Sequence, residues 1–169
     1  MRNSTNNITL PSGMFKNILI KPRGMASAVI VDERALNHLI QAQALLPSNI
    51  QLVLTRAFQR ESFFLKVARG GGAVLFGIIF PNRKGEILDI FGHNGHATDG
   101  RHLDVGVINC NSDIKLLPFG VFTPLKKIKE LFESNKFVLN NVFDALEKSK
   151  FSIHKNYTEC MQIHCDFID

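Results

Sequence analysis

The chain has 169 residues, of which 45% are hydrophobic and 21% are charged, and its formal net charge is +5. This length and composition are typical of a single globular domain and exclude a disordered protein. The basic residues are scattered, which favours a solvated surface over a nucleic-acid-binding patch, while the net charge also suits a carboxylate-bearing substrate.

The three cysteines, Cys110, Cys160 and Cys165, form no C-x-x-C motif. Their odd number argues against a disulfide framework and favours a reducing compartment. No signal peptide is recognisable, so we expect a cytoplasmic protein, or a periplasmic or exported one if a native leader is absent from this chain. The longest apolar run, Ala73–Phe80, is too short to span a bilayer, so no membrane insertion is expected.

The first segment of the chain is polar and contains Pro11-Ser12-Gly13. It predicts a flexible N-terminal arm over residues 1–17, followed by a single domain over residues 18–169. No linker or internal repeat divides the rest of the chain.

Helices are predicted from apolar residues at helical spacing and from capping residues. Asp32 is an N-cap candidate for a helix over Glu33–Leu46. Thr123 precedes a helix over Pro124–Ser134, and a last helix is expected over Asn140–Ser149.

Strands are predicted from alternating or short apolar runs that are bounded by turn residues. Gly70-Gly71-Gly72 is expected to break the chain before a hairpin that leads into a histidine-rich loop. The pattern predicts an α+β domain whose central, mostly antiparallel sheet is flanked by helices. The predicted strands are Asn17–Ile20, Ile50–Arg56, Ala73–Phe80, Glu86–Phe91, His102–Ile108 and Met161–Ile168.

The histidine-rich loop, Gly92–Asp104, holds three of the six histidines of the chain and leads into a buried strand. Alternate side chains of a strand share a face. Leu103 and Val105 belong to the packing face of this strand, so His102 and Asp104 point to the other side.

The last predicted strand offers a matching polar face, which carries Gln162, His164 and Asp166. If the two strands are neighbours, Asp104 and His164 converge on one point. The packing face of the last strand consists of Ile163, Cys165 and Phe167.

Asp104 and His164 need one further ligand, which His96 or His93 of the loop can supply. Two imidazoles and one carboxylate suit zinc, and a site with three protein ligands keeps a position for water. The residues therefore predict a zinc site at one face of the sheet, with chemistry suited to amide hydrolysis.

The loop resembles the metal motif of the D-Ala-D-Ala metallopeptidase group, written S-x-H-x-x-G-x-A-x-D or G-H-x-S-H-x-x-G-x-D-x-D. The matching segments are Gly92-His93-Asn94-Gly95-His96 and Gly100-Arg101-His102-Leu103-Asp104. The group includes zinc D-Ala-D-Ala carboxypeptidases, D-Ala-D-Ala dipeptidases and penicillin-insensitive murein endopeptidases. The resemblance implies a hedgehog-type zinc peptidase fold in which His96 is the first ligand and Asp104 the second.

The strand Leu52–Phe58 is similar to the family's strand that ends in Ser-Gly-Tyr-Arg. The arginine of that strand contacts the substrate and the developing oxyanion. The resemblance implies this catalytic and substrate-binding role for Arg56, with Arg60 as a competitor.

The segment Asn141–Asp166 resembles the family segment that supplies the third ligand and the catalytic carboxylate. The resemblance implies that His164 is the ligand and Glu159 the general base, with Asp166 and Asp99 as alternatives. Residues expected to support the site are His93, His102, Gln162 and Asp166.

Together these features predict a zinc peptidase that hydrolyses a D-amino-acid-containing, peptidoglycan-type peptide through a metal-activated water. Its expected partner is a peptide or peptidoglycan fragment. Whether it is a carboxypeptidase, a dipeptidase or an endopeptidase stays open. Two alternatives are a catalytically inactive zinc-binding relative that acts in recognition and a basic nucleic-acid-binding domain without a metal.

Overall fold

The computed structural model describes residues 6–24, 26–58, 63–92, 99–111, 114–117, 120–154 and 162–168. Within these ranges the protein is an α+β domain whose mostly antiparallel sheet is flanked by helices, which confirms the predicted fold class.

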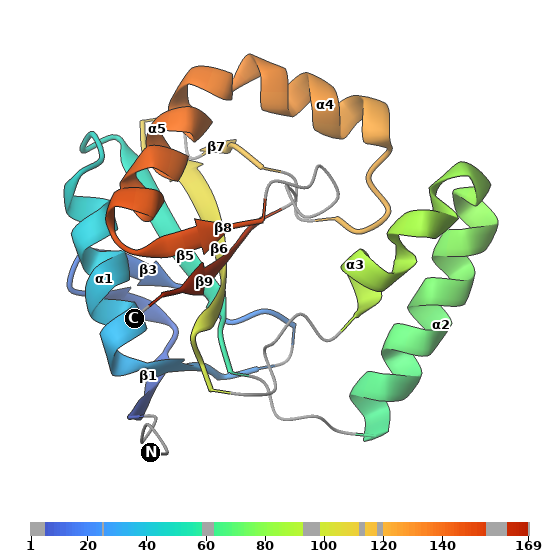
Figure 1. Cartoon of the computed structure of the whole chain (residues 1–169), viewed down its shortest axis with the longest axis horizontal. Coiled ribbons are helices and arrows are strands. Elements are labelled where there is room, and N and C mark those ends of the chain that lie inside the picture. The colour runs from blue at the N-terminus through green and yellow to red at the C-terminus, as the bar shows by residue number, and fades with distance from the viewer. Residues whose placement is uncertain are drawn as a thin grey trace.

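A seven-stranded sheet lies at the centre of the fold (Figure 1). Its strand order is β2-β3-β5-β6-β9-β8, and the short β7 also pairs with β6. β3 and β5 run parallel, whereas the other pairs of this sheet are antiparallel. The strands are β2 (Gly13–Phe15), β3 (Ile18–Ile20), β5 (Ile50–Arg56), β6 (His102–Asn109), β7 (Ile114–Lys115), β8 (Phe151–Ile153) and β9 (Ile163–Phe167).

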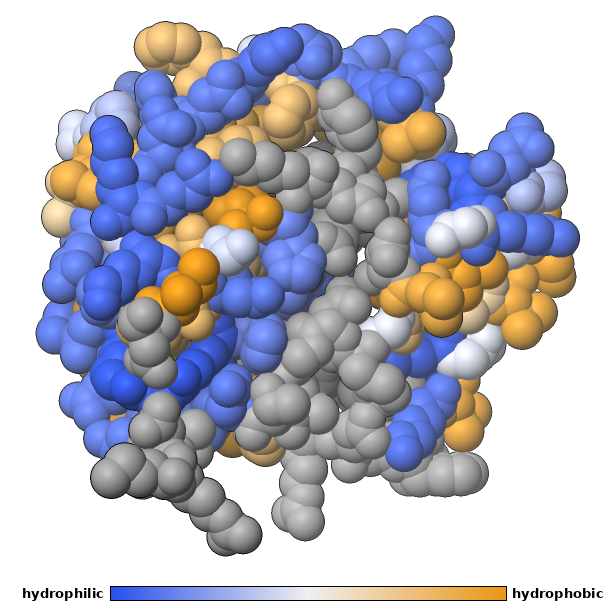
Figure 2. All heavy atoms as spheres, in the orientation of Figure 1, coloured by the Kyte–Doolittle hydropathy of each residue, from blue (hydrophilic) through white to orange (hydrophobic). Residues whose placement is uncertain are grey.

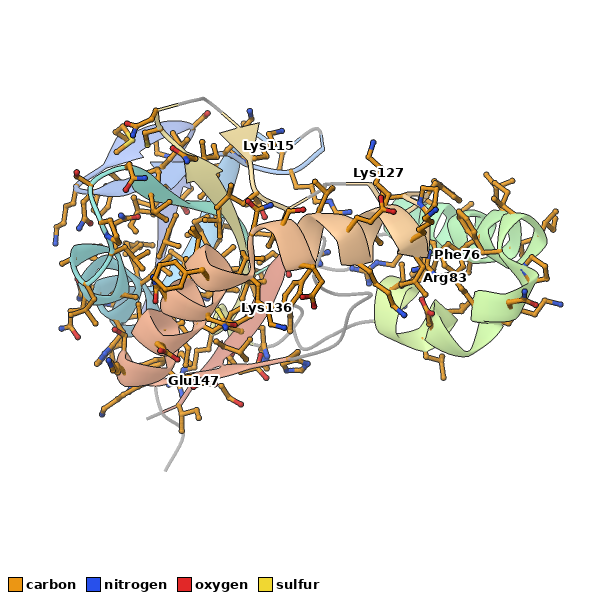
Figure 3. The ribbon with its side chains drawn as sticks, turned by 90° about the horizontal axis from the view of Figure 1, so that it is seen from above. Phe76, Arg83, Lys115, Lys127, Lys136 and Glu147 are labelled. Atoms are coloured by element: carbon orange, nitrogen blue, oxygen red, sulfur yellow. The ribbon has the colours of Figure 1, made fainter. Side chains whose placement is uncertain are left out.

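Helices α1 (Glu33–Ala44) and α5 (Lys136–Lys148) pack on one face of this sheet (Figure 1). A lobe made of α2 (Phe63–Ile79), the 3-10 helix η1 (Pro81–Glu86) and α3 (Ile87–Phe91) stands apart from this body. Helix α4 (Leu125–Ser134) runs from the body toward the lobe (Figure 3). Among the described residues, no helix is both long and apolar enough to cross a membrane.

The core lies between the sheet and α1 with α5. Leu103, Val105 and Val107 of β6 are fully buried, as the alternating pattern predicts. Cys165 of β9 belongs to the same core, and its burial raises the pKa of the thiol, which suits a packing residue. Because this face carries the apolar residues, the opposite face of β6 and β9 is left for polar side chains.

The prediction of a flexible arm is wrong for residues 7–11 and 13–15, which form strands. β1 (Asn7–Pro11) pairs with β4 (Ala28–Asp32), and β2 pairs with β3. Leu10 is buried in the core. Strands this short carry too few alternating residues to stand out beside turn residues such as Pro11 and Gly13.

The hairpin predicted over Ala73–Phe80 and Glu86–Phe91 is also wrong, because residues 73–79 belong to α2 and residues 86–91 to η1 and α3. The three consecutive glycines lie inside α2 and do not break it. A Cβ on Gly72 would lie 2.7 Å from the Phe91 ring, so glycine at this position lets α3 pack closely on α2. A short apolar run occurs in strands and in buried helices, so the sequence pattern does not distinguish the two. Here the tertiary contacts of the lobe favour the helix. The start predicted for the last helix is wrong as well, since α5 begins before Asn140, at Lys136.

Asp32 caps α1 as predicted and also holds the end of the histidine-rich loop. Its carboxylate accepts hydrogen bonds from the backbone N–H groups of Arg34 (2.9 Å) and Ala35 (3.3 Å). Its own N–H donates to the carbonyl of Gly100 (3.1 Å). Gly100 has a φ of +79°, so the loop enters β6 through a conformation that favours glycine.

Gly100→Ala should lower the free energy of unfolding by more than about 1 kcal/mol, since the positive φ would be strained by a side chain. The new Cβ would also lie 2.9 Å from the backbone nitrogen of Asp32 and 2.8 Å from the amide oxygen of Asn7. Urea unfolding followed by circular dichroism measures the change. The control is Gly85→Ala, where nothing lies within 4 Å of the added Cβ. Equal stability of both variants would contradict the packing described for Gly100.

Candidate metal centre

Three neighbouring strands bring Arg56, Asp104 and His164 into one row across the sheet. In the antiparallel pairing, Arg56 lies opposite Asp104, and Asp104 lies opposite His164. Directly opposed residues of antiparallel strands have Cβ atoms about 4.5–5.5 Å apart, close enough for side chains to interact. The predicted convergence of Asp104 and His164 is thus present.

A β-bulge places Arg56 in this row. The register between β5 and β6 shifts between Leu54 and Arg56, so Thr55 is an extra residue on β5. The Thr55 hydroxyl donates to the backbone carbonyl of Asp104 (2.9 Å) and fixes the bulge. Regular pairing would have put Thr55 opposite Asp104, so the bulge redirects the arginine toward the carboxylate.

The carboxylate of Asp104 is buried between a cation and an imidazole. Its Oδ2 receives both Nε and Nη2 of Arg56 at 2.6 Å. Its Oδ1 lies 3.0 Å from Nδ1 of His164. The Asp104 and His164 side chains are only 1% and 3% exposed, so this contact is shielded from water.

The Asp104–His164 contact is a hydrogen bond whose length is also compatible with two ligands of one metal ion. Zinc lies about 2.0–2.2 Å from carboxylate oxygens and imidazole nitrogens, and a tetrahedral angle then places two such atoms about 3.3 Å apart. The observed 3.0 Å between Oδ1 and Nδ1 is close to this spacing. A carboxylate and an imidazole also match the donor types that zinc prefers.

Several predicted site residues lie outside the part of the chain that the structure describes. They are the candidate ligand His96, the support residue His93, the competing arginine Arg60 and the candidate base Glu159. Their roles stay predictions.

A second row of polar side chains lies beside the first. His102 is opposite Asp166 in the β6–β9 register, and its Nδ1 lies 2.7 Å from Oδ1 of Asp166. The other carboxylate oxygen lies 2.8 Å from Nε2 of His154. Nε2 of His164 lies 3.5 Å from Oδ1 of Asp166, so His164 stands between two carboxylates.

Within the described residues, His102, His164 and Asp166 form a group whose ligand atoms all lie within 4.8 Å of one another. This set shares His164 with the predicted one but uses two residues that the sequence assigned to support. A metal at Nδ1 of His164 would leave the contacts of Asp166 with His102 and His154 intact. A metal shared by His102, His164 and Asp166 would replace the contact of Asp166 with His102.

Two further predicted residues contact the site indirectly. The amide oxygen of Gln162 lies 3.2 Å from the Thr55 hydroxyl, next to the bulge. Asp99 accepts the backbone N–H of Arg101 at 3.0 Å, and its Oδ1 lies 3.9 Å from Nε2 of His102. Neither contact is with Asp104 or His164.

Comparisons with known proteins identify no family: no family model matches the chain, and no curated protein is significantly similar to it. The resemblance to D-Ala-D-Ala metallopeptidases therefore stays a prediction from the loop motif.

The sequence did not single out His154. It follows β8 and reaches Asp166 because β8 pairs with β9, and its backbone N–H donates to the carbonyl of His164 (3.0 Å). A lone histidine after a three-residue strand gives no signal of this pairing.

Arg56 also lines a cavity of about 470 Å³ between the sheet and the lobe. Three lining residues are arginines, Arg23, Arg56 and Arg69, and no aspartate or glutamate of the described ranges lines it. Partial desolvation and the nearby charge of Arg56 lower the pKa of Arg23. The remaining lining residues are mostly apolar, including Phe58 and Phe91, so the cavity suits a small ligand with an anionic group.

The charges of the two rows shift the pKa values of their members. Burial opposes protonation of His164, but hydrogen bonds to Asp104 and Asp166 outweigh it and raise the pKa of His164 to about 9. Burial also raises the pKa of Asp166, but hydrogen bonds from His102, His164 and His154 lower it well below its usual range. The hydrogen bond to Asp166 raises the pKa of His102. Without a metal, a protonated His164 therefore bridges two carboxylates.

In metal-free protein, the free energy of unfolding should decrease as the pH rises from about 6.5 to above 9. The raised pKa means that the stabilisation from protonated His164 is complete below the unfolded value of 6.5 and is lost as the pH passes about 9. Urea unfolding in a chelator at a series of pH values measures this decrease. It should shrink in His164→Gln and persist in the control His38→Gln, and an unchanged decrease in His164→Gln would exclude this origin.

Proposed function

We propose that this chain is a zinc-dependent peptidase that cleaves a D-amino-acid-containing, peptidoglycan-type peptide. The observation that carries the proposal is the buried contact between Asp104 and His164 across β6 and β9. The loop motif adds His96 as the third ligand and suggests the substrate class.

Each residue of the first row has a distinct task in this proposal. Oδ1 of Asp104 and Nδ1 of His164 are the metal ligands, and Arg56 fixes the carboxylate by binding Oδ2. Zinc held there would polarise the substrate carbonyl and lower the pKa of a bound water. Oδ1 of Asp166 lies 3.5 Å from Nε2 of His164, and its negative charge favours a proton on Nε2, which is the tautomer that offers Nδ1 to the metal.

Arg56 connects the ligands to the substrate cavity. It contacts Asp104 and lines the cavity of about 470 Å³. A guanidinium anchored by a buried carboxylate is already oriented, so it can stabilise an oxyanion without reorganising. Arg23 and Arg69 make the cavity suited to a peptide that carries a carboxylate.

The candidates for the general base are not equally suited to the task. Both oxygens of Asp166 are engaged by histidines, at 2.7 and 2.8 Å, and these hydrogen bonds lower its pKa. A carboxylate with a strongly lowered pKa is a weak proton acceptor. Asp166 is therefore better suited to orienting His164, and Glu159 remains the first candidate for the base.

The purified chain should contain about one zinc ion, measured by elemental analysis, and hydrolyse D-Ala-D-Ala or muropeptides.

Asp104→Asn and His164→Ala should each lose the metal and the activity because they remove ligands. His102→Ala should retain most of the zinc at saturating metal. Glu159→Ala should retain zinc and lose turnover, and the control His38→Ala should change neither.

The outcomes separate the alternatives. A chain without stoichiometric zinc would contradict the metal site and leave a metal-free role such as nucleic-acid binding. Zinc without turnover of any D-amino-acid peptide would identify a catalytically inactive relative. Loss of zinc in His102→Ala and Asp166→Asn, but not in Asp104→Asn, would move the metal to the second row.

A further inference from the structure

The lobe presents a large apolar surface to solvent, which we call the lobe face. Figure 2 shows hydrophobic side chains gathered over α2 and α3 on the right of the molecule. The lobe face consists of Val67 (57% exposed), Val74 (66%), Leu75 (48%), Ile78 (71%) and Ile79 (50%) of α2 and Leu88 (80%) of α3.

The lobe face is separate from the packing surface of α2. Phe76 is fully buried and contacts the rings of Phe80 and Phe91 inside the lobe. Val74 and Ile78 each lie two positions from Phe76, which places them on the opposite side of the helix. The lobe therefore forms its own internal packing without the lobe face.

Two glycines lie in the middle of the lobe face. Helical spacing puts Gly70 and Gly71 on the same side of α2 as Val67, Val74 and Ile78. Glycine weakens a helix interior relative to alanine, because the backbone loses more conformational freedom on folding. A Cβ on either glycine would meet nothing within 4 Å, so the packing of the single chain does not require glycine here. The two glycines leave a gap on the helix surface that a second molecule can enter.

The order of large and small residues along the lobe face is self-complementary. Two copies of α2 that lie antiparallel across a two-fold axis contact each other reciprocally, so residue i of one copy faces residue j of the other and j faces i. In one such register, the large side chains nearest the axis each face a glycine of the second copy, so that ridges of one helix enter gaps of the other. The facing pairs are Val74 with Gly71, Leu75 with Gly70 and Ile78 with Val67.

The exposed apolar area of the lobe face matches the size that a dimer needs. Burial of its six residues would remove roughly 600 Å² from each chain and about 1,200 Å² from the pair, which is the lower end of the range for specific interfaces. Monomeric proteins rarely expose a contiguous apolar patch of more than about a few hundred Å². The area and the reciprocal order of residues both favour a second copy of this chain as the occupant.

We propose that the lobe face joins two copies of this chain in a two-fold dimer, in which α2 packs antiparallel on α2 of the second copy. The lobe projects from the body in two perpendicular views, so that two lobes can meet without obstruction by the sheets (Figures 1 and 3). This inference is independent of the proposed metal chemistry.

Sedimentation velocity of the full chain tests the pairing. The unchanged chain should sediment as a dimer with twice the 19.0 kDa mass of one chain. Its Kd should be about micromolar or lower. Val74→Glu should raise the Kd about a hundredfold or more, because it places an unpaired charge against the second helix. Circular dichroism checks that each variant has the helix content of the unchanged chain.

Gly71→Leu distinguishes the two-fold pairing from other uses of the lobe face. The variant enlarges the apolar surface, so it would strengthen docking on a lipid surface. In the dimer, the new side chain would occupy the gap that receives Val74, so it should raise the Kd about tenfold or more. Combining Gly71→Val with Val74→Gly again places a large residue opposite a small one and should restore the dimer.

Matched controls are Phe137→Glu, which changes an 80% exposed apolar residue of α5, and Gly85→Leu, where an added Cβ also meets nothing within 4 Å. Both should dimerise like the unchanged chain. A chain that stays monomeric at about 100 μM would overturn the proposal. A dimer that Val74→Glu leaves intact or that Gly71→Leu strengthens would also overturn it. Flotation of a monomeric chain with phospholipid vesicles would overturn it by assigning the lobe face to a membrane.

Discussion

The site depends on the burial of one carboxylate, Asp104, between the guanidinium of Arg56 and the imidazole of His164. A buried charge must be paired and hydrogen-bonded, because desolvation costs several kcal/mol per ion. Arg56 supplies one counter-charge at Oδ2 and leaves Oδ1 facing His164. Oδ1 contacts the imidazole of His164 in the metal-free chain, and in the proposed site it would instead bind a metal ion that His164 shares.

Asp166 of the second row places a second carboxylate next to His164. In the proposed site, a metal ion would replace the proton on Nδ1 while Asp166 stays beside Nε2, as for a histidine ligand supported by a carboxylate. Both rows exist because the side chains of β6 and β9 alternate between the two faces of the sheet. Their apolar residues pack on α1 and α5, so the polar residues at alternating positions collect on the other face.

The alternation that places Leu103 in the core and Asp104 opposite it is a local property, so the sequence predicts it, as it predicts the matching faces of β9. The same alternation brings His164 toward Asp104 once the strands pair. The bulge at Thr55 is not local, because it depends on the register between β5 and β6. The sequence pattern does not predict the helix at residues 73–79 for a similar reason. The contacts of Phe76 with Phe80 and Phe91 form only in the folded lobe.

The proposed metal site specifies the position at which zinc should bind. Anomalous diffraction from zinc-soaked crystals, recorded on both sides of the zinc absorption edge, tests it most directly. The proposed site predicts one peak about 2.0–2.2 Å from Oδ1 of Asp104 and Nδ1 of His164. A peak among His102, Asp166 and Nε2 of His164, or no peak near His164, would contradict it.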